Sequence, residues 1–286
     1  MKKFTKKHLR IAVSCLVVLA VMSAFTALIA VPSVKNAVIK SAKESLFENY
    51  YSFPEGALIT AANGFKENNK NTLLYVKTAV GSDADGIEVD VCFSEDGTPY
   101  VAESAEDIGS NTMPVEYLVS YLSEEAANDN IRRHYINFHL QDAANLEELS
   151  KIITDYQMEE YCFFTGVNAN QAKYVRTSSS IGFYLDYEID KSKINNPEYC
   201  SLVVNEVSQS GAIGINCDYD NFSDILSIML KENWLKISFT GVENELDAIK
   251  ALQYSPNQII ASNPEQVRSI LIEWNANAPS SDIIIS

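Results

Sequence analysis

The sequence predicts an α/β protein, a (β/α)8 TIM barrel preceded by an N-terminal transmembrane helix. Three observations lead to this fold class. The 286-residue chain opens with a basic, apolar leader, β-rich runs then alternate with helical segments, and no low-complexity linker divides the series. Alternating strands and helices are typical of a parallel sheet covered by helices, and eight such units can close into a barrel.

Residues 11–31 form an uncharged, mostly apolar segment. At about 1.5 Å of rise per residue, a helix of this length crosses a hydrocarbon core of about 30 Å. A cleaved secretory signal is the alternative, but Ala27 and Ala30 do not have the spacing of a small-x-small cleavage site. Basic residues in 1–10 predict a cytosolic tail, so the rest of the chain is expected outside the cell membrane, anchored by a single pass.

Residues 32–54 are predicted to form a stalk that leads into a barrel of residues 55–286. Helix in the stalk is indicated by apolar residues at intervals of four, namely Val34, Val38, Ala42 and Leu46.

Eight segments of the barrel region have the composition of strands: 57–63, 86–93, 134–141, 160–167, 181–188, 212–218, 235–242 and 258–262. Helical spacing occupies segments between them, including 71–80, 145–156, 197–209, 222–233, 245–254 and 264–275. An open doubly wound sheet also alternates in this way, but its nucleotide-binding version needs a glycine-rich first turn. The first turn here reads Ala61-Ala62-Asn63-Gly64, which favours the barrel.

Charge and cysteine content limit the function classes. Beyond the leader, which holds five of the 22 Lys and Arg, the chain has 17 basic and 38 acidic residues, a formal charge of −21. Such a domain is repelled by phosphate backbones, so nucleic-acid binding is not expected. An oxidising location would allow disulfides, but we expect free, buried thiols at four positions: Cys92, Cys162, Cys200 and Cys217. Their connectivity, if any, is not given by the sequence.

Glu88 and Asp90 are the strongest chemical signal in the chain. They share one face of the strand 86–93, and isoleucine and valine occupy the other face. Packing the apolar face under helices turns both acids into the barrel, which is unfavourable unless a cation or hydrogen bonds compensate. The same alternation turns His139 toward them. The alternatives are a hydrogen-bonded or ion-paired rim for the acids and a simply hydrogen-bonded histidine.

Other polar and aromatic residues fall near strand ends, where barrels collect their functional groups. Asp186, Asn216 and Asp218 make the predicted mouth more acidic. An anionic diester would meet net repulsion there, so a bound metal or a neutral or cationic ligand is expected. Tyr184 and Tyr187 are expected to be ordinary core and rim aromatics, with stacking on a sugar or polyol as the alternative.

Three motifs follow one another in the N-terminal half: Asn71-Thr72 before an apolar helix, ADGIEVDV at 84–91, and DGTPYV at 96–101. This progression resembles that of the glycerophosphodiester phosphodiesterase family, and weaker similarity continues through 136–141, 235–240 and 258–264. The resemblance implies a TIM barrel, a divalent metal ion such as Mn²⁺, Zn²⁺, Mg²⁺ or Ca²⁺, and hydrolysis of glycerophosphodiesters to an alcohol and glycerol 3-phosphate.

The sequence departs from the family pattern at both catalytic histidines. Where the family has His-Arg-Gly, this chain has Ala62-Asn63-Gly64, and where the family has Phe-His-Asp it has Ala102-Glu103-Ser104. The third metal carboxylate of the family aligns with His139, and its lysine aligns with Gln141. The resemblance therefore implies a metal set of Glu88, Asp90 and His139, substrate-binding roles for Asn63 and Gln141, and Glu103 as the candidate catalytic residue.

Two functions follow from this pattern. The first is a membrane-anchored, extracytoplasmic relative that is catalytically impaired and binds a glycerophosphodiester, a polyol or a protein partner. The second is an active, divergent, metal-dependent phosphodiesterase in which Glu103 acts as acid and base. General acid–base help contributes about 10²–10⁴-fold per group, so replacement of both histidines favours the first.

Overall fold

A computed structural model describes residues 32–48, 57–67, 70–127 and 133–277. The chain divides into two units, Met1–Glu48 and Asn49–Ser286. In the first unit, α2 (Pro32–Glu48) is a helix within the predicted stalk. The predicted transmembrane segment 11–31 lies outside the described residues, and none of the helices that the structure describes is both long enough and apolar enough to cross a membrane.

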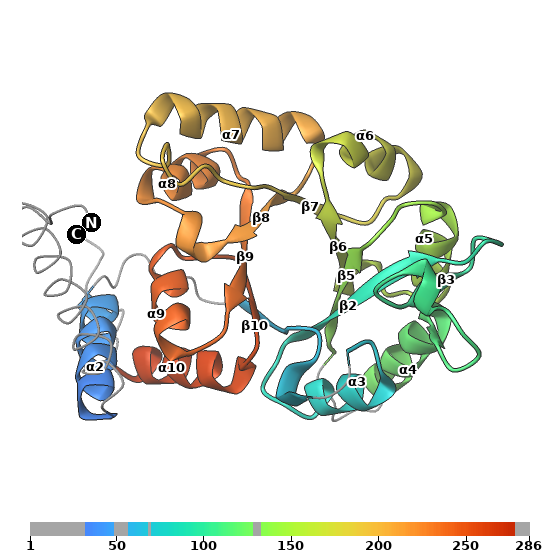
Figure 1. The fold of residues 1–286 in the computed structure, drawn as a ribbon, viewed down its shortest axis with the longest axis horizontal. Helices are drawn as coiled ribbons and strands as arrows, with labels where there is room; N and C mark the ends of the chain where they lie inside the picture. The colour runs from blue at the N-terminus through green and yellow to red at the C-terminus, as the bar shows by residue number, and fades with distance from the viewer. Residues whose placement is uncertain (1–31, 49–56, 68–69, 128–132, 278–286) are drawn as a thin grey trace, which may run out of the picture. The chain divides into compact units, whose positions relative to one another are not determined.

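Eight parallel strands of the second unit close into a barrel (Figure 1). They are β1 (Leu58–Ala61), β2 (Gly86–Phe93), β5 (Tyr135–Leu140), β6 (Cys162–Val167), β7 (Phe183–Asp186), β8 (Gly214–Asp218), β9 (Lys236–Val242) and β10 (Gln258–Ala261). Their order is β1-β10-β9-β8-β7-β6-β5-β2, and pairing of β1 with β2 completes the ring. The predicted TIM barrel is confirmed, and each observed strand lies within a predicted one.

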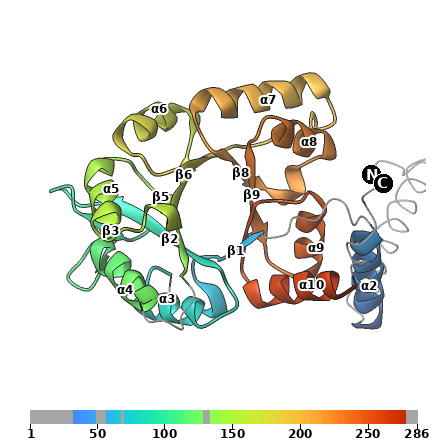
Figure 2. The ribbon, with the colours of Figure 1, turned by 180° about the vertical axis from the view of Figure 1, so that it is seen from behind.

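The helices surround the strands, as Figure 2 shows from the opposite side. They are α3 (Leu73–Val80), α4 (Val115–Ala127), α5 (Leu146–Asp155), α6 (Ala169–Ser178), α7 (Pro197–Ser210), α8 (Asp224–Glu232), α9 (Glu245–Gln253) and α10 (Pro264–Asn277). Local sequence explains several boundaries. Asn168 begins α6 with a capping box, and α7 starts at Pro197 after the cap Asn196 and ends at Gly211 in the left-handed region.

A short hairpin extends β2 beyond the barrel. Its strands, β3 (Pro99–Val101) and β4 (Met113–Pro114), are antiparallel to their neighbours. The segment between them includes the 3-10 helix η3 (Ala105–Asp107), and further 3-10 turns are η2 (Phe65–Glu67), η4 (Glu159–Tyr161) and η5 (Tyr219–Asn221). The hairpin was not predicted, and it places Glu103 on a loop at the carboxyl end of the barrel.

The core lies between the outward faces of the strands and the helices. Ile59, Ile87, Val89, Ile136 and Phe138 are fully buried there. Burial of each such side chain stabilises the fold by about 1.5–3 kcal/mol. The prediction for the cysteines is confirmed, because four of them are buried thiols without a disulfide: Cys92, Cys162, Cys200 and Cys217.

An ion pair holds the closure of the ring at the amino end of β2. Arg268 Nη2 on α10 donates to Asp85 Oδ1 at 2.6 Å, and Asp85 Oδ2 accepts from the backbone N–H of Ile59 at 2.7 Å. The carboxylate of Asp85 is almost fully buried. One acid therefore joins β1, β2 and α10 where the barrel closes.

Candidate functional site

The carboxyl end of β2 presents the two predicted acids to the barrel interior. Ile87, Val89 and Val91 are fully buried toward the helices, so Glu88 and Asp90 face the other way. The hydroxyl of Tyr75 on α3 lies 2.8 Å from the carbonyl oxygen of Glu88. The same hydroxyl lies 2.9 Å from the carbonyl oxygen of Ala61, which fixes β1 beside β2.

Asp90 is enclosed by three side-chain amides. Its Oδ2 accepts from Asn63 Nδ2 at 2.6 Å and from Asn71 Nδ2 at 2.9 Å. Its Oδ1 accepts from Gln141 Nε2 at 2.9 Å. We call Asp90 with Asn63, Asn71 and Gln141 the Asp90 cluster. Both residues predicted to bind substrate, Asn63 and Gln141, are thus brought to one carboxylate.

Asn71 belongs to the Asp90 cluster but was not among the predicted site residues. Its backbone has φ 57°, a left-handed conformation that asparagine tolerates better than most residues. Its Oδ1 accepts from the backbone N–H of Asp90 at 3.0 Å and from Asn63 Nδ2 at 2.9 Å. The only sequence signal for it was its place before the apolar helix, which says nothing about a partner on β2.

Glu88 begins a second hydrogen-bonded series that runs across β5 and β6. Glu88 Oε2 accepts from Asn137 Nδ2 at 3.1 Å, and Asn137 Oδ1 accepts from the hydroxyl of Thr165 at 2.8 Å. His139 Nδ1 lies 3.2 Å from the same hydroxyl. Because Thr165 gives its only hydrogen to Asn137, we infer that Nδ1 of His139 is the donor, which leaves Nε2 of the neutral ring as an acceptor.

A third acid, Asp186, stands at the end of β7. Its Oδ1 accepts from the backbone N–H of Gly166 at 3.0 Å and from Asn216 Nδ2 at 3.0 Å. Gly166 has φ 76°, and a Cβ there would lie 2.5 Å from the carbonyl oxygen of Leu140, so only glycine fits. Asp218, also predicted near the mouth, is exposed and caps η5 through the backbone N–H of Asp220.

These groups surround a cavity of about 450 Å³ that we call the mouth cavity. Its lining comes from the carboxyl ends of five strands and the residues that follow them: Glu88, His139, Asp186, Tyr187, Glu188, Asn216, Cys217 and Thr240. No lysine or arginine occurs among these described lining residues. Tyr187 is one of the lining residues, whereas Tyr184 is buried and packs edge-on against Phe163, as expected for a core aromatic.

Two carboxyl groups at the mouth cavity have raised pKa values. The pKa of Glu88 is raised to about 7, chiefly by burial and in smaller part by the charges of Asp90 and Asp186, while His139 opposes the shift. Burial also raises the pKa of Asp186, against the hydrogen bond from Asn216 and the effect of His139. Glu88 is therefore poised to change its protonation state near neutral pH.

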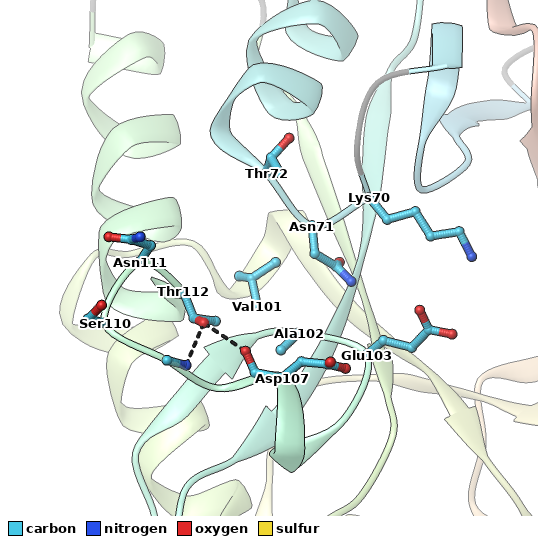
Figure 3. A pocket seen from close by; sticks show the side chains of 11 residues that line it. Lys70, Asn71, Thr72, Val101, Ala102, Glu103, Asp107, Ser110, Asn111 and Thr112 are labelled. Carbon is cyan, nitrogen blue, oxygen red and sulfur yellow. Dashed lines mark hydrogen bonds between the residues drawn. The ribbon is translucent and has the colours of Figure 1, made fainter.

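Glu103 lies in a neighbouring pocket of about 550 Å³ rather than in the lining of the mouth cavity (Figure 3). The lining of this pocket is largely polar and consists of Lys70, Asn71, Thr72, Val101, Ala102, Glu103, Asp107, Gly109, Ser110, Asn111 and Thr112. Glu103 is exposed. Asn71 connects the two regions, because it lines this pocket and also donates to Asp90.

The arrangement around Asp90 does not fit the predicted metal set of Glu88, Asp90 and His139. Amide donors already occupy both oxygens of Asp90. Oδ1 of Asp90 keeps one lone pair, but the amide N–H groups around the carboxylate present positive hydrogen atoms that would repel a cation. In the described part of the chain, no group of three or more His, Cys, Asp or Glu side chains is arranged to hold a metal ion. The metal set stays a prediction that these contacts do not support.

A closed ring of eight parallel strands with polar residues at their carboxyl ends defines a (β/α)8 barrel protein with its candidate site on the usual face. Comparison with known structures identifies barrels of this class that have a similar fold. A phosphodiesterase from Oleispira antarctica, solved with the product sn-glycerol-3-phosphate, matches with a TM-score of 0.57 and 13% identity over 78% of this chain and 99% of that one.

Glycerophosphodiester phosphodiesterases from two further organisms match similarly. The Parabacteroides distasonis structure has a TM-score of 0.58 and 13% identity, covering 76% of this chain and 97% of that one. The Agrobacterium tumefaciens structure has a TM-score of 0.56 and 14% identity, covering 74% and 99%. No family model and no curated protein sequence matches the chain. The chain has the fold of the glycerophosphodiester phosphodiesterases, as its motifs implied.

Proposed function

We propose that this chain is a membrane-anchored, extracytoplasmic domain that has the glycerophosphodiester phosphodiesterase fold, is impaired in diester hydrolysis, and binds a ligand at the barrel mouth. The observation that carries the proposal is the Asp90 cluster. At the end of the first strand, Ala62 stands where the family pattern has its catalytic histidine and Asn63 stands where it has the arginine, and the amide of Asn63 donates to Asp90 at 2.6 Å.

The chemistry of hydrolysis explains why this replacement matters. One group must take a proton from the attacking hydroxyl and another must give a proton to the leaving alkoxide, each contributing about 10²–10⁴-fold. Neither the methyl group of Ala62 nor the amide of Asn63 transfers a proton near neutral pH, and the amide carries no charge to replace that of the arginine. The mouth cavity also lacks a lysine or arginine among its described lining residues, so it offers no fixed positive charge to a phosphodiester.

An active, divergent phosphodiesterase is the competing function, with Glu103 as acid and base. Its support is the position of Glu103 in the pocket that shares Asn71 with the Asp90 cluster. Against it, Glu103 is exposed and does not line the mouth cavity with Glu88 and His139. A general acid needs a pKa raised toward the working pH, which burial rather than exposure provides.

Hydrolysis is tested with the full-length chain purified in mild detergent. Glycerophosphocholine and glycerophosphoglycerol are supplied with Mn²⁺, Mg²⁺, Ca²⁺ or Zn²⁺, and release of glycerol 3-phosphate is measured. We expect no turnover above that of the variant Glu88→Ala. Turnover that disappears in both Glu88→Ala and Glu103→Gln would instead establish the active phosphodiesterase.

Anchoring depends on residues 11–31 and needs its own test. The full chain should stay with the membrane fraction after alkaline carbonate extraction, and protease added outside intact cells should digest residues 57–277. A variant with three charged residues introduced into 11–31 should lose membrane retention. Recovery of the unaltered chain in the soluble fraction would contradict the anchor.

A further inference from the structure

A row of polar side chains crosses the barrel interior below the mouth cavity. Asp186, Asn216, Ser238 and Gln258 occupy one register row on β7, β8, β9 and β10. Asn216 Nδ2 donates to Asp186 Oδ1, and the hydroxyl of Ser238 donates to Asn216 Oδ1 at 2.8 Å. We call these four residues the floor row. Its first two members line the mouth cavity.

The last member of the floor row has no partner. Gln258 is fully buried, and neither Nε2 nor Oε1 of its amide makes a hydrogen bond. The hydroxyl of Thr60 on the neighbouring strand β1 is likewise buried without a partner. Each unsatisfied buried polar group costs about 1–3 kcal/mol, and TIM-barrel interiors are ordinarily filled by branched apolar side chains. Polar atoms held there at such a cost indicate a polar partner from outside the chain, such as a buried water.

The lining of the mouth cavity selects among possible ligands. Its carboxylates repel anions, and neither lysine nor arginine occurs among its described lining residues to offset that repulsion. Its remaining lining residues carry an amide, a hydroxyl, an imidazole, the thiol of Cys217 and the phenol of Tyr187, whose hydroxyl donates to Glu206. Carboxylates accept hydrogen bonds from hydroxyl groups, amides both donate and accept, and a tyrosine ring packs on an apolar face. The volume lies within the ~300–1,000 Å³ typical of small-molecule sites.

We propose that the mouth cavity binds a neutral polyhydroxylated compound, a sugar or polyol, with the floor row as its polar base. The inference rests on the proposed function, because it names the ligand class of the same mouth. Hydroxyl groups of the ligand donate to Glu88 and Asp186. Gln258 lies at the buried end of the floor row, outside the lining of the mouth cavity, and bonds to a water beneath the ligand.

The test uses the full-length protein and ligand-observed NMR with glycerol, myo-inositol, glucose and N-acetylglucosamine at millimolar concentration. Inorganic phosphate, glycerol 3-phosphate and choline form the charged comparison set. We expect binding of at least one neutral compound and weaker binding of each charged one. Asp186→Asn should weaken the neutral ligand about tenfold or more, whereas Glu232→Gln, an exposed carboxylate on α8, should leave its affinity unchanged.

Gln258→Met is the second variant, and it keeps the proposal falsifiable if Asp186→Asn fails to fold. It replaces the unpartnered amide by an apolar side chain of similar size, so it should fold at least as stably as the parent and still bind the neutral ligand more weakly. Unchanged affinity in this variant would overturn the role of the floor row.

Other outcomes overturn the ligand class itself. If choline binds most tightly, the cavity is a cation site. If phosphate or glycerol 3-phosphate binds most tightly, it is an anion site. If no neutral compound binds, the cavity is not a polyol site. The hydrolysis assay on the same preparation separates the two proposals. Turnover of glycerophosphocholine refutes the proposed function, whereas absence of both turnover and polyol binding refutes only the ligand class.

Discussion

The carboxylates at the two ends of strand β2 have different partners. At the amino end, Asp85 is paired with Arg268 and with the backbone N–H of Ile59. At the carboxyl end, Glu88 and Asp90 are held by neutral amides from Asn137 and the Asp90 cluster, and the pKa of Glu88 is raised by burial. The first end is balanced in charge and closes the barrel. Among the described residues, the carboxyl end has no cation beside its acids, and these acids lie next to a cavity. Such an arrangement is typical of a functional site rather than of a structural contact.

The largest expected effect comes from breaking the balanced end. Arg268→Leu should leave the buried carboxylate of Asp85 without its cation and destabilise the protein by about 3 kcal/mol. Lys66→Leu is the matched control, because its pair with Glu265 is exposed and should contribute less than about 1 kcal/mol. Denaturant titration of both variants measures the difference. Equal effects of the two substitutions would show that Asp85 does not depend on Arg268.

The stability of the Asp90 cluster should depend on the hydrogen-bond acceptor at position 90 more than on the shape of that side chain. Asp90→Leu leaves the amides of Asn63 and Asn71 without their acceptor and should destabilise the fold by about 3 kcal/mol. Asp90→Asn keeps one oxygen for those two donors, and the exposed Gln141 can turn to present its own oxygen, so about 1 kcal/mol is expected. If Asn and Leu were equally harmful in thermal unfolding, the negative charge rather than the acceptor would be essential.

The pH dependence of stability should reveal Glu88. Its pKa rises from 4.5 to about 7 on folding, so the folded state holds a proton that the unfolded state releases between these values. Its contribution is therefore fully present below about pH 4.5, declines as pH rises, and is lost above about pH 7, by about 3 kcal/mol in all. Burial is the main cause of the shift, which Asp90 and Asp186 increase and His139 decreases.

Glu88→Gln imitates the protonated acid and should remove this decline. Unfolding midpoints of the variant and the parent, measured at about pH 5 and about pH 8, should converge at the lower pH and differ at the higher one, with the variant more stable. A parent whose stability instead increases over that range would contradict a raised pKa.

The smallest expected effect is that of metal removal. Because amides occupy both oxygens of Asp90, treatment with EDTA should leave the Tm of the full-length chain unchanged, and added Mn²⁺ should not raise it. A rise in Tm with Mn²⁺ that is absent in Glu88→Ala would restore the predicted metal set. Metal analysis after gel filtration gives an independent measurement.

The strand pattern alone determined much of this protein. Alternation in 86–93 placed Glu88 and Asp90 on the inward face, and the observed β2 spans the same residues. The same rule brought His139 to the mouth cavity. These predictions succeed because side-chain direction along a strand is a local property with a period of two residues.

The partners of these acids were decided only by the tertiary structure. Asn71, Asn137 and Gln258 carry no local signal of their roles, since their neighbours across the barrel stand on strands or loops many residues away. The strand register and the closure of the barrel decide which groups lie beside each carboxylate. They therefore decide whether the carboxylate binds a cation, a hydroxyl group or an amide. The local sequence determines which face of a strand a side chain occupies, but the closed barrel determines which residues that side chain contacts.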